Sequence, residues 1–241
     1  MSQKTILGFV IIKTDQVIEE ECRNIVQRID TKNNIELLFS KFSLYNNIVS
    51  KESFVKSACK IGPCVDSFVK DPTIVGLGCT SMSFTLGSHK VNSELSKDSL
   101  IKATDMARAQ IEGLISLNAQ KICLLTSYTE VLSQMNASFI EKAGISVVKR
   151  HTLNILKDVD TSAITPEKIT EMVQEIDCDE ADAIVIGCSA FRTCGHGFID
   201  NLEKLVQKPI VTSTQSFCWL MLRSAGITQR INGYGKLFSH C

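Results

Sequence analysis

Residues 74–80 read IVGLGCT and residues 184–189 read IVIGCS, and these two stretches are the most informative about the fold. Each is a short apolar run that ends in glycine, cysteine and a hydroxyl-bearing residue, a pattern typical of a buried strand that opens into a turn. Their cysteines, Cys79 and Cys188, stand almost half of the 241-residue chain apart. The repetition predicts two similar halves, joined near residues 118–121.

Short apolar runs alternate with amphipathic stretches along the whole chain. The expected strands are 5–12, 35–39, 74–77, 121–125, 146–150, 183–186 and 209–212. The expected helices are 17–28, 50–69, 99–118, 131–143, 166–176, 197–207 and 215–225. This alternation predicts an α/β fold of two similar three-layer αβα halves, related by a pseudo-two-fold axis, with mostly parallel sheets. We expect residues 1–117 and 118–213 to form the halves, with the C-terminal helix in 214–241 packing back onto the first.

The two Gly-Cys turns predict a shared active site in the cleft between the halves. In parallel sheets, ligands bind beyond the carboxyl ends of the strands, so Cys79 and Cys188 are expected on opposite sides of one cleft. Backbone N–H groups after each cysteine are expected to bind an anion and to lower the thiol pKa. The alternative is that both cysteines only fill the core, as free cysteines commonly do. The matched glycine and hydroxyl neighbours favour a functional pair.

Composition argues against several classes of function. The chain has 26 basic and 26 acidic side chains, and a formal charge of zero argues against nucleic acid or an anionic membrane as a partner. No run approaches the ~20 apolar residues of a membrane span, and the N-terminal sequence lacks the features of a signal peptide. We therefore expect a cytoplasmic protein.

Metal and nucleotide cofactors are not expected. The ten cysteines include no C-x-x-C pair, and the four histidines form no recognisable ligand set, so no metal site is predicted. The stretch Gly76-Leu77-Gly78 fails the G-x-G-x-x-G pattern because Ser81 stands at its last position, and no P-loop sequence is present. Most of the cysteines are expected to be reduced and buried.

Two further stretches bear on the site. Tyr128 follows the expected strand 121–125, which places its hydroxyl near the same rim as the two cysteines. The sequence Cys194-Gly195-His196-Gly197 admits a catalytic Cys/His pair, but adjacent glycines more often mark a turn. We interpret it as a turn into the helix that begins near Gly197.

Four short motifs, in the right order, carry a resemblance to a known family. The chain resembles the aspartate/glutamate racemase superfamily, in particular its branch of maleate cis–trans isomerases and arylmalonate decarboxylases. Residues 78–84 (GCTSMSF) resemble the first active-site loop of that branch, and residues 187–193 (GCSAFRT) resemble its second cysteine loop. Residues 126–129 (TSYT) resemble its substrate-binding turn, and residues 208–226 its C-terminal strand and helix.

The resemblance implies a cofactor-independent enzyme that forms a carbanion, an enediolate or a thiol adduct beside a carboxylate. In two-cysteine members, one cysteine acts on one face of the substrate and the other returns a proton from the opposite face. The decarboxylases carry glycine at the first cysteine position, so this chain resembles an isomerase or racemase with Cys79 and Cys188 as catalytic residues. The substrate carboxylate is expected in a cradle of Thr80, Ser81, Tyr128 and the amides of Ser189 and Ala190.

Two departures from the family pattern bear on the substrate. Maleate isomerases place an asparagine shortly after the first strand, where this chain has Asp15, and a second asparagine is replaced by an acid near Asp158. Two carboxylates would repel a dicarboxylate such as maleate. The turn Thr14-Asp15-Gln16 resembles that of ectoine-utilisation proteins in the same branch. We therefore expect the substrate to be a small, nitrogen-bearing carboxylic acid, with Asp15 among the binding residues.

Other functions remain open at this point. The chain can be a maleate cis–trans isomerase proper, or an arylmalonate-type decarboxylase that uses Cys188. A non-enzyme alternative is a protein that binds small carboxylates, or a redox sensor with Cys79 or Cys188 as the reactive thiol. The expected partner in each enzymatic reading is a small carboxylate, and homo-oligomer formation is left open.

Overall fold

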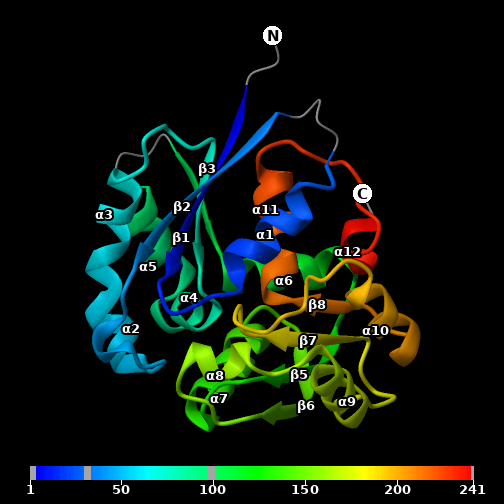
Figure 1. Cartoon of the computed structure of the whole chain (residues 1–241). Helices are drawn as coiled ribbons and strands as arrows, with labels where there is room; N and C mark the ends of the chain where they lie inside the picture. The colour runs from blue at the N-terminus through cyan, green and yellow to red at the C-terminus, as the bar shows by residue number, and fades with distance from the viewer. Residues whose placement is uncertain (1–3, 30–33, 97–100, 240–241) are drawn as a thin grey trace.

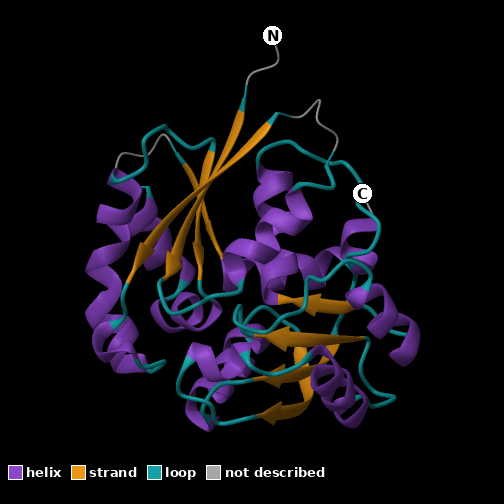
Figure 2. Cartoon of the chain, in the orientation of Figure 1, coloured by secondary structure: helices purple, strands orange, loops and turns teal. Residues whose placement is uncertain are grey.

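A computed structural model describes residues 4–29, 34–96 and 101–239 of the chain. Its framework is two four-stranded parallel sheets with helices on both faces (Figure 1 and Figure 2). The strand order is β2-β1-β3-β4 in the first sheet and β6-β5-β7-β8 in the second, so both sheets have the same topology. The predicted α/β fold of two similar halves with parallel sheets is confirmed.

The strands of the two sheets correspond one to one. The first sheet contains β1 (Thr5–Ile12), β2 (Ile35–Phe42), β3 (Ile74–Gly78) and β4 (Lys102–Asp105), and the second contains β5 (Lys121–Thr126), β6 (Ser146–Thr152), β7 (Ala183–Gly187) and β8 (Ile210–Thr212). Every residue of β3 and of β7 is buried. Strands that are covered on both faces are continuous apolar runs, which explains why these two were recognisable from sequence.

Helices connect the successive strands within each sheet, link the first sheet to the second and follow the last strand. The first half contains α1 (Ile18–Val26), η2 (Tyr45–Asn47), α2 (Lys51–Ser57), η3 (Ala58–Lys60), α3 (Ile61–Asp66), α4 (Thr80–Leu86), α5 (Ser88–Leu95) and α6 (Met106–Ser116). The second contains α7 (Glu130–Glu141), α8 (Asp158–Ser162), α9 (Pro166–Ile176), α10 (Phe198–Val206), α11 (Ser213–Ser224) and α12 (Gly235–Ser239). Helix α9 begins as its sequence predicts, because Thr165 caps it and proline follows at the first helical turn.

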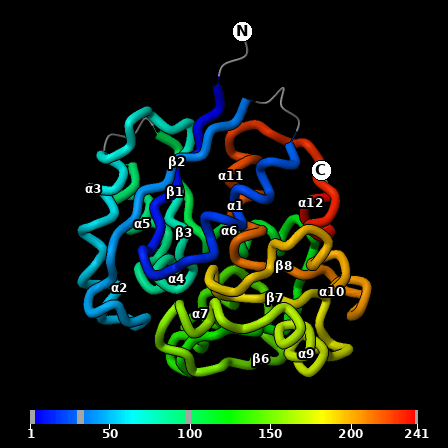
Figure 3. Tube along the Cα trace, viewed as in Figure 1, coloured from blue at the N-terminus to red at the C-terminus, as the bar shows by residue number. Residues whose placement is uncertain are grey.

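The C-terminal part of the chain returns to the first sheet. Helix α11 packs against α6, α1 and β3, and Figure 3 traces this orange segment back beside the blue N-terminal helix. Its side chains Phe217 and Met221 approach Gly76 so closely that a Cβ there would lie 2.6 Å from the Phe217 ring. Gly76 therefore serves helix packing. The proposed boundaries at residues 117 and 213 remain a prediction.

The largest hydrophobic core cluster extends through both halves. It includes Val10 and Leu77 from the first sheet and Leu125 and Ile186 from the second, and it reaches both Gly-Cys turns. Because the halves share this core, the carboxyl ends of β3 and β7 are held in a fixed relation to each other.

Three expectations about local structure were wrong. The expected helix 99–118 contains β4 at its beginning, because this four-residue strand pairs with β3 without presenting an apolar run; residues 99 and 100 lie outside the described part. The expected helix 50–69 is divided into α2, η3 and α3, since Pro63 cannot donate the backbone hydrogen bond that would continue one helix. Helices α4 and α5 were missed, and Gly87, at a φ of +82°, separates them.

Within residues 4–29, 34–96 and 101–239, no helix combines the length and the apolar character that crossing a membrane requires.

Candidate active site

Cys79 lies where β3 ends and α4 begins. Its sulfur accepts a hydrogen bond from the Met82 backbone N–H at 3.5 Å and lies 3.5 Å from the Ser81 hydroxyl. The Ser83 side chain donates to the Cys79 carbonyl at 2.7 Å, which fixes the backbone of the turn. The cysteine thus caps α4, with only 6% of its surface exposed.

Cys188 occupies the corresponding position after β7, and 7% of its surface is exposed. No helix follows it directly; residues 189–197 form an irregular loop before α10. Its backbone N–H donates to Ser213 Oγ at 2.9 Å. The Ser127 side chain and the Ala190 N–H both interact with its sulfur. The second cysteine turn is therefore stabilised by residues from three separate segments.

Both thiols are held in the protonated form, contrary to the expectation that strand-end N–H groups lower their pKa. Burial raises the pKa of Cys79 to about 12, with Asp158 and Asp15 adding to the rise against hydrogen bonds from Ser81 and Met82. Burial also raises the pKa of Cys188 well above its ordinary value, and the same two carboxylates contribute. The local sequence indicates that N–H groups lie near each sulfur, but not how deeply the sulfur is buried. Burial has the larger effect on the thiol pKa here.

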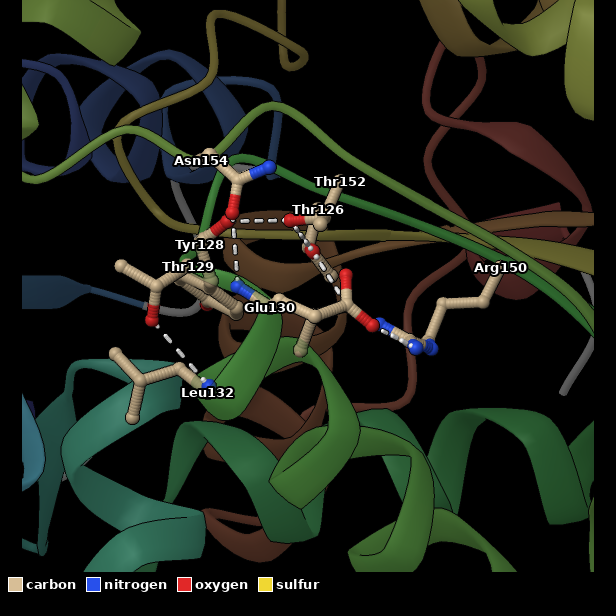
Figure 4. Close-up of polar contacts among 9 residues, drawn as sticks. Thr126, Tyr128, Thr129, Glu130, Leu132, Arg150, Thr152 and Asn154 are labelled. Carbon is tan, nitrogen blue, oxygen red and sulfur yellow. Dashed lines mark hydrogen bonds and ion pairs between the residues drawn. The ribbon is translucent and has the colours of Figure 1, made fainter.

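Tyr128 is held over the site by a network of polar contacts at the end of β5 (Figure 4). The Thr152 hydroxyl donates to the Tyr128 carbonyl and accepts from the Thr126 hydroxyl at 2.9 Å. Asn154 accepts from the Glu130 N–H at 3.0 Å, and the Glu130 carboxylate pairs with an arginine of β6. This network links β5 to β6 and fixes the turn that carries the phenol ring.

The phenol of Tyr128 is a buried hydrogen-bond donor. Only 1% of its surface is exposed, and its ring packs edge-on against Phe84 at 5.8 Å between centroids. Burial raises the pKa of Tyr128 well above its ordinary value, and the nearby thiols of Cys188 and Cys79 add to the rise. Within the described part of the chain, its hydroxyl makes no protein hydrogen bond of standard geometry. The Thr80 side chain interacts with the phenol and opposes the rise in its pKa, so Tyr128 holds its proton beside Thr80 at this site.

Two carboxyl groups act on both cysteines. Asp15 follows β1 and accepts the N–H groups of Val17 and Ile18 through Oδ1, at 2.9 and 3.1 Å. Burial raises its pKa, although the Ser189 side chain and these N–H groups oppose the rise. Its other oxygen, Oδ2, is buried without a hydrogen-bond partner among the described residues. The Ser189 side chain is another polar group that interacts with this carboxyl.

Asp158, the first residue of α8, is the second of these groups. The Thr14 hydroxyl donates to its Oδ2 at 2.7 Å, so the carboxyl joins α8 to the turn that carries Asp15. Burial raises the pKa of Asp158 to about 6, and the charge of Asp15 adds to the rise although Thr14 opposes it. The structure therefore places the acid expected near residue 158 beside the turn that carries Asp15.

Ser213 joins the two cysteine turns, and sequence analysis missed it. Its hydroxyl lies 2.8 Å from the Thr80 hydroxyl, beside the first cysteine, and accepts the Cys188 N–H of the second. The Gln110 side chain also donates to it at 3.0 Å. Ser213 begins α11, directly after Thr212 of the capping box. A capping box was the only local signal, and it predicts a helix start rather than a link between halves.

The predicted binding residues lie at this site and are buried. Thr80 and Ser81 form the first turn of α4, and Ser189 and Ala190 follow Cys188. The Thr80 hydroxyl is engaged by Ser213, as described above. Among the described residues, no three His, Cys, Asp or Glu side chains are grouped to hold a metal ion.

The predicted turn at residues 194–197 is confirmed. Gly197, at a φ of +83°, immediately precedes α10. The exposed His196 ring packs against Tyr234, whereas the Cys194 thiol is buried beside Thr193 and Thr212. The described cysteines are all free, and Cys59 is the exposed one among them.

Glu21 of α1 anchors the loop that follows Cys188. Its carboxyl accepts the Cys194 N–H at 2.7 Å across the two halves. Burial raises the pKa of Glu21 from an ordinary 4.5 to about 8, against the opposing effect of the Cys194 and Thr193 N–H groups. Between these two pH values, the unfolded state loses the proton and the folded state keeps it. Stability therefore falls as pH rises from about 4.5 to 8.

We expect Glu21→Gln to remove this part of the pH dependence, because glutamine keeps the acceptor without ionising. The gain in thermal midpoint of the variant over the parent should grow between pH 5 and pH 8. Thermal unfolding at a series of pH values measures it. Glu20→Gln, at an exposed neighbouring carboxylate, is the control and should give a difference that does not grow with pH. A constant difference for Glu21→Gln would contradict the assignment.

Each half has a parallel sheet in which a buried strand ends in Gly-Cys, and both cysteines lie at one buried site. This arrangement defines a class of proteins. It is the aspartate/glutamate racemase superfamily, in its maleate isomerase and arylmalonate decarboxylase branch. The chain belongs to the arylmalonate decarboxylase family, whose sequence profile matches residues 39–238.

Two proteins with sequences similar to this chain are enzymes. Maleate isomerase of Nocardia farcinica (strain IFM 10152) is 21% identical over 242 residues, which cover 96% of this chain and 94% of the relative. Arylmalonate decarboxylase of Bordetella bronchiseptica is 25% identical over 175 residues, which cover 68% of this chain and 70% of the relative.

Solved structures share the fold over nearly the whole chain. A variant of Nocardia farcinica maleate cis–trans isomerase with a covalently bound succinylcysteine intermediate has a TM-score of 0.88 at 20% identity, covering 98% of this chain and 99% of that one. A variant of the maleate isomerase of Pseudomonas putida S16 with maleate has a TM-score of 0.86 at 18% identity, covering 99% of each chain.

Proposed function

We propose that this protein is a cofactor-independent isomerase or racemase that acts beside the carboxylate of a small carboxylic acid, with Cys79 and Cys188 as its catalytic residues. The observation that carries the proposal is the equivalent position of the two cysteines, at the ends of β3 and β7, under the influence of the same carboxyl groups. Membership of the arylmalonate decarboxylase family supports it.

In the proposed mechanism, the two sulfurs work on opposite faces of the substrate. One thiolate removes the proton next to the carboxylate, so that a C–H bond breaks and an S–H bond forms. The other thiol then gives its proton to the opposite face, and the sulfurs exchange roles. Tyr128 and the N–H group of Ser189 donate to the carboxylate as it becomes an enediolate, with Thr80, Ser81 and Ala190 beside them.

A thiolate must form before the substrate proton is removed. A positive charge on the substrate favours formation of that thiolate. Asp15 and Asp158 raise the pKa of both thiols. A cationic nitrogen bound between the carboxylates offsets their charge and thereby favours loss of a thiol proton. The Oδ2 atom of Asp15 accepts no hydrogen bond of standard geometry from the described residues, and we assign it as the acceptor of such an N–H group. We therefore propose a nitrogen-bearing carboxylic acid as the substrate class.

A thiol adduct is a second candidate mechanism, and the succinylcysteine intermediate of the Nocardia farcinica relative favours it. A thiolate would add to a C=C bond, rotation would follow about the resulting single bond, and elimination would release the trans isomer. This route corresponds to a maleate cis–trans isomerase. The arylmalonate decarboxylase relative supports a third reaction, loss of carbon dioxide with protonation by Cys188.

The substrate class is tested with a panel of maleate, an arylmalonate, aspartate, glutamate and a hydantoin, followed by NMR. We expect the parent protein to convert a nitrogen-bearing acid at least about 10-fold faster than maleate, because maleate brings no cationic nitrogen to offset the charges of Asp15 and Asp158. Asp15→Asn combined with Asp158→Asn should reverse this preference, since the amides keep the hydrogen bonds without the charge.

Asp160→Asn, at an exposed position of α8, is the matched control and should leave the preference unchanged. Faster turnover of maleate by the parent protein would contradict the nitrogen-bearing class and favour the adduct route.

A further inference from the structure

A second pair of thiols lies outside the candidate active site. Cys123 and Cys178 face each other with their sulfurs 3.4 Å apart, although 55 positions separate them in sequence. Cys123 is a fully buried residue of β5 and is paired between Lys149 of β6 and Ile184 of β7. Cys178 lies in the connection between α9 and β7 and is half-buried. The pair thus joins a core strand to the protein surface.

The pair lies near the opposite ends of the strands from the proposed chemistry. Cys123 is the third residue of β5, whereas Tyr128 follows the carboxyl end of that strand. Cys178 precedes β7, and Cys188 follows it. The proposed reaction at Cys79 and Cys188 therefore makes no use of this second pair.

Two ammonium groups lie close to these sulfurs. Lys208 donates to the Cys178 carbonyl at 2.5 Å and to Asp177 Oδ1 at 2.7 Å. Burial opposes its charge, but Asp177 and the thiols of Cys123 and Cys178 raise the pKa of Lys208 overall. Lys149 donates to the Glu175 carbonyl at 2.8 Å and interacts electrostatically with Cys123. Burial, the neighbouring Cys178 thiol and the charge of Asp177 nevertheless raise the pKa of the Cys123 thiol to about 12, so Cys123 is the protonated member of the pair.

We propose that Cys123 and Cys178 form an oxidative modification site that a hydroperoxide converts into a disulfide. The Cys178 thiolate, the accessible member, attacks the peroxide: an S–O bond forms, the O–O bond breaks, and the leaving oxygen takes a proton. The Cys123 thiol then attacks the sulfenic acid, so that an S–S bond forms and water leaves. Two thiols lose two electrons in all, and the peroxide gains them.

The geometry requires little movement for the second step. The sulfurs need to approach from 3.4 Å to a bond length of about 2.05 Å. Because the sulfenic acid forms in contact with a buried thiol, condensation is faster than a second oxidation. Cys59 is the internal comparison, since its thiol is exposed and contacts a backbone carbonyl rather than another sulfur.

The test is peptide mapping of the parent protein after treatment with one equivalent of hydrogen peroxide and alkylation of the remaining thiols. We expect a cross-linked peptide pair containing Cys123 and Cys178, two hydrogens lighter than the sum of the reduced peptides. Cys59 should stay alkylated or appear as a sulfenic or sulfinic acid. In Cys178→Ser, the cross-link should disappear and Cys123 should remain an alkylatable thiol.

A second measurement keeps the test independent of any one variant. A disulfide that closes a 55-residue separation should raise the thermal midpoint of the treated parent protein by roughly 5–10 °C, reversibly with dithiothreitol. Recovery of Cys178 as a sulfinic acid with Cys123 still reduced would overturn the proposal. So would oxidation of Cys59 while both members of the pair remain thiols.

Discussion

Replacing either Cys79 or Cys188 with alanine is expected to lower kcat by about 10²–10⁴-fold on the substrate that the parent protein converts best. The reason is that a two-sided proton transfer needs an acid on one face and a base on the other, and neither sulfur can serve both faces. Both side chains are small and buried, so alanine leaves the turns largely intact. Steady-state kinetics measures the loss, and circular dichroism verifies the fold.

Cys194→Ala is the matched control for this prediction. Its thiol is as deeply buried and lies in the loop that follows Cys188, but its contacts are to Thr193, Thr212 and Glu21. We expect kcat to stay within a few fold of the parent value. Loss of activity in Cys188→Ala but not in Cys79→Ala, with release of carbon dioxide, would instead favour the decarboxylase reaction.

The second large effect is expected at Ser213. Removing its hydroxyl in Ser213→Ala leaves the Cys188 N–H and the Gln110 side chain without their acceptor and Thr80 without its partner. Buried polar groups left unpaired cost about 1–3 kcal/mol each. Both cysteine turns also lose the hydrogen-bond partner that they share. We expect kcat to fall by about 10–100-fold, which corresponds to roughly 1.4–2.7 kcal/mol of transition-state stabilisation.

Ser216→Ala is the control for Ser213→Ala. It removes another buried hydroxyl of α11, but one that donates only to the Thr212 and Ser213 carbonyls of its own segment. We expect near-parent kinetics from it, and partial recovery from Ser213→Thr. Iodoacetamide labelling provides a readout that needs no substrate: Ser213→Ala should change the alkylation rates of Cys79 and Cys188 together. A change at Cys188 alone would contradict the shared role.

Much of the fold was predictable because the informative elements are buried on both faces. Strands β3 and β7 are covered by helices, so their sequences are uninterrupted apolar runs that end at a turn. The Gly-Cys-hydroxyl pattern recurs because equivalent strands in the two halves end at the same site. Strand β4 gave no such signal, since its four residues include Lys102 and Asp105.

The chemistry of the site was less predictable because it depends on long-range contacts. The thiol pKa was expected to fall on the strength of neighbouring N–H groups, but burial and two distant carboxyl groups raise it. Asp158 is hydrogen-bonded to Thr14, 144 positions away in sequence, and Ser213 is hydrogen-bonded to Thr80, 133 positions away. No periodicity or motif at either position indicates those partners. The sequence identified Cys79 and Cys188 as candidate catalytic residues, and the fold identifies what surrounds them.

The central claim is that Cys79 and Cys188 act on opposite faces of one substrate. The most direct measurement is proton NMR in D₂O on one enantiomer of the best nitrogen-bearing substrate, with the parent protein, Cys79→Ala and Cys188→Ala. The two-sulfur account predicts that the parent yields the opposite enantiomer with deuterium beside the carboxylate, and that each variant fails to invert the substrate. Inversion with deuterium uptake that persists in both variants would contradict it.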